Sequence, residues 1–160
     1  MDMEQAHDKV INSQEYKDAN LENHYLSHVS MVQEKGSDEN WEFGYFSSET
    51  KKITVFESNP VKKREPDDIV SFDDKVNQLD LDEVVISFSE AMSKAESLAN
   101  EKKVNVVQKK IIILQKTDKP MWNITFLTTD FNLLNVKLDA VTGKVISADF
   151  HSVYDLGMKS

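Results

Sequence analysis

Two stretches of alternating apolar and polar residues, each opened by a tryptophan, restrict the fold of this chain more than any other feature. In the second stretch Trp122, Ile124 and Phe126 alternate with Asn123 and Thr125, and residues 41–45 show the same alternation. A period of two is typical of a strand that buries one face of a sheet. Both stretches are therefore predicted to be strands of an antiparallel sheet with one polar side.

A constant offset of 81 positions relates the two stretches. The hairpin that follows each of them keeps its length, because residues 46–52 match residues 127–133 without a gap. An internal duplication explains this coincidence, and the alternative is a chance alignment of two unrelated amphipathic hairpins. The matched apolar pairs are Trp41 and Trp122, Phe43 and Ile124, Tyr45 and Phe126, Ile53 and Leu134, and Val55 and Val136.

A helix is predicted ahead of the strands in each half. In the second half, Ser87 is followed three positions later by Glu90, the signature of a capping box, and an apolar stripe at helical spacing runs to about residue 100. In the first half the apolar residues at 3, 6 and 10 predict a helix over 3–15. Strands are predicted over 26–33, 41–47, 52–57, 104–115, 121–129, 134–138 and 144–150.

These elements predict an α+β fold made of a tandem repeat, in which each unit is a helix packed on an antiparallel sheet of three to four strands. The first repeat is assigned to residues 1–58 and the second to residues 85–160. Residues 59–84 contain Pro60 and the charged run 62–68, which indicate a charged connector. The sequence is compatible with one shared core and with two separate cores.

The turn Asp139-Ala140-Val141-Thr142-Gly143 is the most specific motif in the chain. In such a turn the aspartate accepts backbone N–H bonds and the glycine adopts a positive φ. Together with the helix sequence SEAMSKA and the strand WNITF, the turn makes residues 85–150 resemble the PepSY domain. Residues 3–57 resemble a degenerate copy, since Ser58-Asn59-Pro60 stand where the second half has Asp139-Ala140-Val141.

The resemblance to PepSY implies a cystatin-like packing of helix on sheet and a binding or inhibitory role. PepSY domains occur in propeptides of thermolysin-like metallopeptidases and in cell-envelope and spore-germination proteins. A protein partner, such as a peptidase or an envelope component, is therefore expected. The resemblance also implies an extracytoplasmic location if a leader has been trimmed; otherwise the chain is expected to be cytoplasmic, since its first residues contain no secretory signal.

The net charge of −9 lies entirely in the first half. Residues 1–80 contain 9 Lys/Arg and 18 Asp/Glu, whereas residues 81–160 contain 10 of each class. An acidic surface repels phosphate backbones, so no nucleic-acid partner is expected. The longest aliphatic run, 111–114, is far shorter than the roughly 20 apolar residues that span a bilayer. The absence of cysteine excludes disulfides and thiolate metal sites.

Motifs for catalysis are lacking: the chain has no GxSxG, Walker, GxGxxG or HExxH sequence. It is therefore predicted not to be an enzyme and to have no cofactor, metal or catalytic residue. His24 and His28 are four positions apart, a spacing that does not converge on a metal from a strand. Two acidic groups, 80–83 and 67–68 with 73–74, lack the spacing of a calcium loop and are expected to be solvated.

We therefore expect a protein-binding module that uses an edge of its sheet or the outer sheet face. The strand over 104–115 is apolar on both faces, so it is central, covered, or paired with a partner. No residue is assigned to the partner contact, and self-association is compatible with this expectation. A hydrolase with an unrecognised site is the least favoured of three classes of function. The main alternative is a small-molecule or lipid carrier with a pocket between helix and sheet, lined by Phe88, Met92, Leu98, Trp122 and Phe126.

Overall fold

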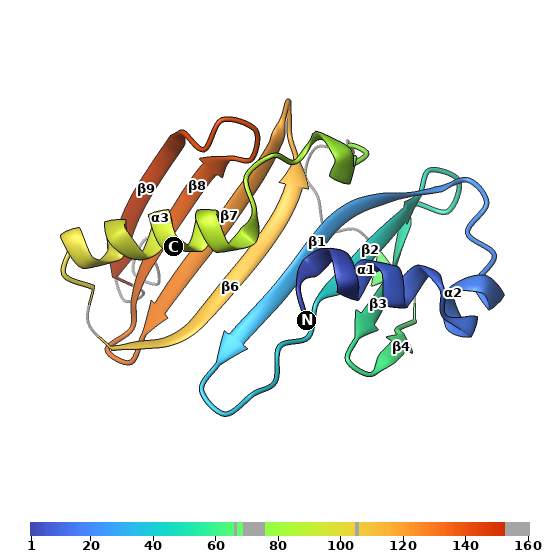
Figure 1. Cartoon of the computed structure of the whole chain (residues 1–160), viewed down its shortest axis with the longest axis horizontal. Helices are drawn as coiled ribbons and strands as arrows, with labels where there is room; N and C mark the ends of the chain where they lie inside the picture. The colour runs from blue at the N-terminus through green and yellow to red at the C-terminus, as the bar shows by residue number, and fades with distance from the viewer. Residues whose placement is uncertain (66, 69–75, 105, 153–160) are drawn as a thin grey trace.

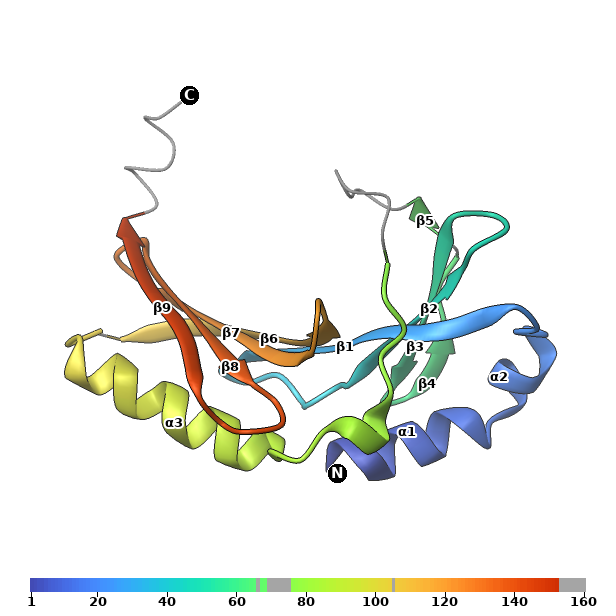
Figure 2. The same cartoon turned by 90° about the horizontal axis from the view of Figure 1, so that it is seen from above.

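The computed structural model describes residues 1–65, 67–68, 76–104 and 106–152, which form an α+β fold around one large antiparallel sheet (Figure 1). The sheet has nine strands: eight follow the order β4-β3-β2-β1-β6-β7-β8-β9, and β5 also pairs with β3. The helices lie on one face of the sheet (Figure 2). The predicted α+β class and antiparallel pairing are confirmed.

The first half contains α1 (Met3–Ile11), α2 (Gln14–Asp18), β1 (His24–Glu34), β2 (Glu42–Ser47) and β3 (Lys52–Ser58). The connector contains β4 (Val61–Lys63), β5 (Asp67–Asp68) and the short 3-10 helix η1 (Leu81–Glu83). The second half contains α3 (Phe88–Glu101), β6 (Val107–Lys116), β7 (Pro120–Thr128), β8 (Asn132–Asp139) and β9 (Val145–Ser152).

Side-chain caps determine where the helices begin. Ser87 caps α3 as predicted, because its hydroxyl accepts the Glu90 N–H at 3.1 Å. The helix predicted over 3–15 instead ends at Ile11, and a second short helix begins at Gln14. The reason is Ser13, whose hydroxyl accepts the N–H of Tyr16 at 3.2 Å and so caps a new helix in place of continuing α1.

The two halves are joined into one sheet by the pairing of β1 with β6. The antiparallel register runs from His28 opposite Gln115 to Glu34 opposite Lys109. The strand predicted over 104–115 is therefore central, with β1 on one side and β7 on the other. Its helix-facing residues Ile112 and Leu114 are fully buried, and Ile111 and Ile113 on the other face are partly buried.

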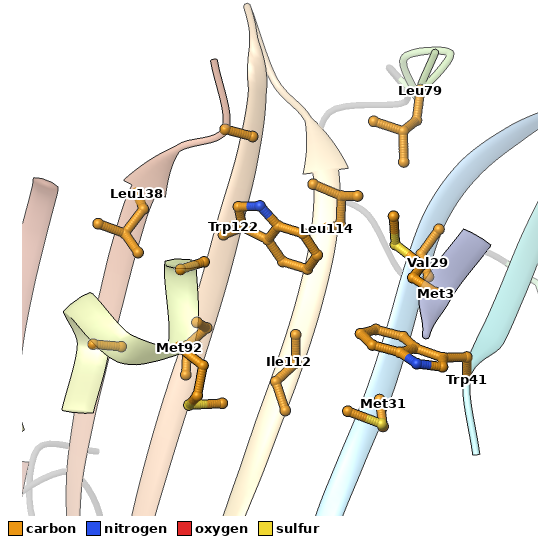
Figure 3. Packing of buried hydrophobic residues seen from close by; sticks show 14 of the residues in the cluster. Met3, Val29, Met31, Trp41, Leu79, Met92, Ile112, Leu114, Trp122 and Leu138 are labelled. Carbon is orange, nitrogen blue, oxygen red and sulfur yellow. The ribbon is translucent and has the colours of Figure 1, made fainter. Parts of the chain in front are cut away.

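One hydrophobic core extends across the junction. Trp122 has no exposed surface and Trp41 is 2% exposed, and the side chains between them come from β1 and β6 (Figure 3). Phe88 contacts both indoles, with ring centroids 5.1 Å from Trp41 and 5.9 Å from Trp122. The halves therefore share their core, and the packing of each depends on the other.

The two hairpins differ in register by one residue. Phe46 pairs with Ile53, whereas the matching Leu127 pairs with Leu133, so the first hairpin connection is one residue longer. The prediction that Ile53 and Val55 match the buried residues of β8 is therefore wrong. The helix-facing residues of β3 are instead Thr54 and Phe56, which are buried, because one inserted residue moves every later side chain to the opposite face.

The connector is attached to both halves. On the first half, β4 and β5 pair with β3, and the Leu79 N–H donates to the Leu26 carbonyl at 2.7 Å. On the second half, the Asn77 side-chain amide donates to the carbonyls of Lys116 and Thr117 at 3.1 and 2.6 Å. Leu79 is 2% exposed and belongs to the core. Within the described part of the connector, Leu79 is thus packed on the sheet and not left in solvent.

Candidate functional site

One edge of the sheet is long and uncovered in the described part of the chain. β9 ends the strand order and pairs only with β8, so the other side of its backbone faces no described strand. Val145, Ile146 and Phe150 are 38%, 46% and 46% exposed. Backbone N–H and C=O groups flanked by apolar side chains are the features to which an extended polypeptide adds as a further strand.

The opposite edge is protected. β4 has three residues and ends in Lys62 and Lys63, and Arg64 follows them. The Arg64 guanidinium is 3.2 Å from the Glu42 carboxylate on β2. Short strands and charged side chains are the usual means by which proteins prevent edge-to-edge pairing. The two edges of the same sheet are thus built differently, and within the described residues β9 is the longer edge strand.

The turn between β8 and β9 is held rigidly by Asp139. One carboxylate oxygen accepts the N–H groups of Val141 and Thr142 at 2.8 and 3.1 Å. The other oxygen is 2.9 Å from the Lys119 ammonium. The bond to Lys119 and then the two backbone N–H bonds hold the pKa of Asp139 well below its usual value of 3.8. The carboxylate is therefore a structural anchor at the start of β9, as the turn motif predicted.

Gly143 completes the same turn. Its φ is +80°, a conformation that other residues rarely adopt. A Cβ at this position would lie 2.8 Å from the Lys94 ammonium, which donates to the Gly143 carbonyl at 2.8 Å. The turn is thus fastened to α3 as well as to β7, and β9 leaves it in a fixed direction.

An open groove of about 720 Å³ lies between α1, the sheet and residues 78–82. On its wall, His7 Nε2 and the Tyr45 hydroxyl form a hydrogen bond of 3.0 Å, and the Tyr16 ring meets the Tyr45 ring edge-on at 5.5 Å. Burial lowers the pKa of His7, against a smaller opposing effect of the Asp8 carboxylate. Burial, followed by the neighbouring Tyr16, raises the pKa of Tyr45. Both side chains are therefore neutral near pH 7.

The pocket predicted for a carrier is largely absent at its predicted place. A pocket of about 290 Å³ is lined by Phe88 and Trp122, but Met92, Leu98 and Phe126 do not line it. Phe126 is 1% exposed and belongs to the packed core. The ligand-sized groove lies in the other half, where no pocket was predicted.

His24 and His28, the two histidines considered as metal ligands, make separate contacts. His24 Nδ1 is 3.0 Å from the Glu22 carbonyl, and the His28 ring lies on Gly44, where a Cβ would be 2.1 Å from its Cε1. Burial and the nearby Arg64 charge lower the pKa of His28. Within the described residues no cluster of three or more His, Asp or Glu side chains could hold a metal, and residues 73–74 lie outside that part of the chain.

Comparison with known proteins gives a family match in the second half. Residues 85–149 match the family model described as "PepSY: Peptidase propeptide and YPEB domain". The resemblance of this segment to the PepSY domain, which its helix, strand and turn motifs predicted, is therefore confirmed. The family is of a propeptide type and not a catalytic one.

A solved structure resembles a larger part of the chain. It is a Clostridium difficile 630 protein described as a "putative lipoprotein", with a TM-score of 0.54 at 15% identity over 85% of this chain and 88% of that chain. At this identity the likeness shows a shared fold, and its coverage includes part of the first half. A search of curated proteins found no match. Within the described residues, no helix has the length and apolar character needed to span a membrane.

Proposed function

We propose that this protein is a non-enzymatic, tandem PepSY-like module that binds an extended polypeptide along β9. The single observation that carries the proposal is the eight-residue edge strand, whose outer backbone side faces no other described strand. We further propose that residues 1–58 are a degenerate first repeat, residues 59–84 a connector and residues 85–160 the second repeat.

The exposed apolar side chains of β9 support this role. An added strand gains backbone hydrogen bonds from the edge and buries neighbouring apolar groups at about 25 cal/mol per Å². Ile146 is the extra residue of a β-bulge, because Lys137 pairs with Ser147 and Leu138 pairs with Val145. Bulges at an edge redirect side chains, so the bulge places Ile146 where a partner strand can contact it.

The comparisons suggest the kind of partner. The matched family is named for peptidase propeptides, so the proposed partner is a peptidase whose activity the module inhibits or regulates. The structural neighbour is described as a lipoprotein, which favours an envelope component as the other proposed partner. Both are polypeptides and both fit strand addition.

Affinity capture with charge-matched variants tests the proposal. The variant Ile146→Lys/Phe150→Lys puts two charges on the edge, and Val32→Lys/Val106→Lys puts two charges on exposed valines elsewhere. Wild type and control are expected to retain the same partner from native extract, and the edge variant to retain at least about tenfold less. Hydrogen exchange of the complex should show slowed exchange of the β9 amides. Equal capture by all three proteins, or protection confined to other strands, would refute binding at β9.

A second candidate function is a small-molecule carrier. The observation that favours it is the groove of about 720 Å³ beside α1, which lies within the volume range of small-molecule sites. It lies in the other half from β9, and either function can hold without the other.

A further inference from the structure

Two adjoining pockets form one groove along α1. The pocket of about 720 Å³ and a neighbouring one of about 380 Å³ share His7, Leu81 and Asp82 among their lining residues. Together they extend between α1 and the segment that contains η1, and Figure 2 shows this segment running beside α1. The combined space is large enough for a small organic molecule.

The wall of the groove is apolar and aromatic. Ile11, Leu26, Leu79 and Leu81 contribute aliphatic surface. Two of its polar atoms, His7 Nε2 and the Tyr45 hydroxyl, are already bonded to each other. The wall therefore favours an apolar or aromatic part of a ligand over a group that needs new hydrogen bonds.

The rim of the groove is acidic. Its carboxylates are Asp80 and Asp82 in the larger pocket and Glu4, Asp8 and Asp82 in the smaller one. Among the described residues that line the two pockets, none is lysine or arginine. The first half also carries the whole negative charge of the chain. A positive group at the mouth of the groove would thus meet carboxylates, which attract cations.

We propose that this groove binds an organic cation, an ammonium attached to an apolar or aromatic body, with the body against Tyr16 and Tyr45 and the charge at Asp80 and Asp82. This assignment rests on the carrier function and not on the β9 edge. Failure of the test below would remove the carrier role and leave strand addition at β9 unaffected.

Three probes of similar shape and different charge test which sign of ligand charge the groove prefers. They are 4-phenylbutylamine, 4-phenylbutanol and 4-phenylbutyrate, titrated into the isotopically labelled full chain and followed by NMR shifts of backbone amides. The amine is expected to bind about tenfold more tightly than the alcohol, and the acid more weakly than the alcohol. The shifted amides should belong to α1, Tyr45 and residues 78–82, and added salt should reduce the preference for the amine.

Variants that remove carboxylate charges test whether Asp80 and Asp82 cause the preference for the amine. Asp80→Asn/Asp82→Asn keeps an oxygen that can accept the Asp82 N–H, as Asp80 does at 2.9 Å, so the local fold is preserved. The matched control is Asp38→Asn/Asp118→Asn, which removes two exposed charges outside the groove. The groove variant is expected to bind the amine no better than the alcohol, and the control to keep the tenfold difference.

Ile11→Trp fills the groove without changing its charge, and circular dichroism checks that the variant is folded. It is expected to weaken the binding of both amine and alcohol. The proposal is overturned by equal affinity of wild type for the three probes, by an unchanged amine preference in the groove variant, or by unchanged binding in a folded Ile11→Trp protein.

Discussion

The two halves of the molecule place the same kinds of element on one sheet and leave different parts of it accessible. α1 has nine residues, α3 has 14, and the short first helix leaves an open groove beside the sheet. The longer α3 buries Ala91, Ala95 and Ala99, small residues that let a helix approach closely. In the first half the groove beside α1 is open, and the short strand β4 forms the sheet edge. In the second half α3 packs closely on the sheet, and the outer side of β9 faces no described strand.

This difference shows that a shared architecture does not fix where binding surface arises. A one-residue change in hairpin length, the break between α1 and α2, and the presence of β4 are each local features. Each decides which backbone or apolar groups remain uncovered. Variants in matched positions of the two halves can therefore test how far the halves are equivalent.

The largest effect is expected from the paired tryptophans. Trp122→Ala and Trp41→Ala should each destabilise the protein by about 3–5 kcal/mol, the usual cost of removing a buried aromatic ring. Trp122→Ala should cost about 1 kcal/mol more, because its indole N–H donates to the Ile86 carbonyl at 2.9 Å. Urea unfolding measures both free energies. Because the core is shared, each variant should unfold in a single transition, and separate transitions for the halves would contradict the shared core.

The turn that distinguishes the second half gives the next effect. Asp139→Ala removes the acceptor of two backbone N–H groups and should cost about 1–3 kcal/mol near neutral pH. The pKa of Asp139 is lower in the folded protein than in the unfolded chain, so its contribution is complete above about 3.8 and is lost as the pH falls below that value. The difference between wild type and Asp139→Asn should therefore shrink on acidification to about pH 3. A difference in stability between the two proteins that stays constant over this pH range would show that the charge of the Asp139 carboxylate does not stabilise the fold.

A close contact that only the first half contains predicts a smaller effect. The His28 ring lies over Gly44, and a Cβ there would be 2.1 Å from the ring. Gly44→Ala should destabilise the protein by about 1 kcal/mol, at the low end for overpacking because the ring can move. In a His28→Ala background the clash is absent, so Gly44→Ala should cost less there than it does in the wild-type protein. Additive effects in thermal unfolding would mean that the two residues do not interact.

Much of the fold is encoded in local patterns. The alternation around Trp122 predicted β7, the serine at 87 predicted the start of α3, and Asp139 and Gly143 predicted the turn before β9. Each of these signals acts between residues close in sequence. The pairing of β1 with β6 joins strands about 80 residues apart, and nothing local specifies that partner.

The candidate sites were less accessible to sequence reasoning for the same physical reason. The strand predicted over 144–150 exists, but its status as an edge follows from the order of all the strands. The groove follows from the place where Ser13 ends α1 and from the path of residues 78–82. A polar His7 on the apolar stripe of α1 was the one available signal, since polar residues on a packed helix face often meet a specific partner.

The smallest expected effect concerns acid sensitivity, which His7 in the first half should introduce at a higher pH than Asp139 does in the second. The pKa of His7 lies below its usual value of 6.5 because burial disfavours the imidazolium, and Asp8 opposes this effect only in part. The unfolded chain therefore takes up this proton at a higher pH than the folded protein, so stability is complete above about 6.5 and declines as the pH falls below it. His7→Gln should make this decline in melting temperature smaller. The decline that remains should come from His28, whose pKa is lowered in the same direction. His151→Gln, at an exposed position on β9, serves as the control and should keep the wild-type profile. A decline of the same size in wild type and His7→Gln would place the acid-sensitive contact outside the groove beside α1.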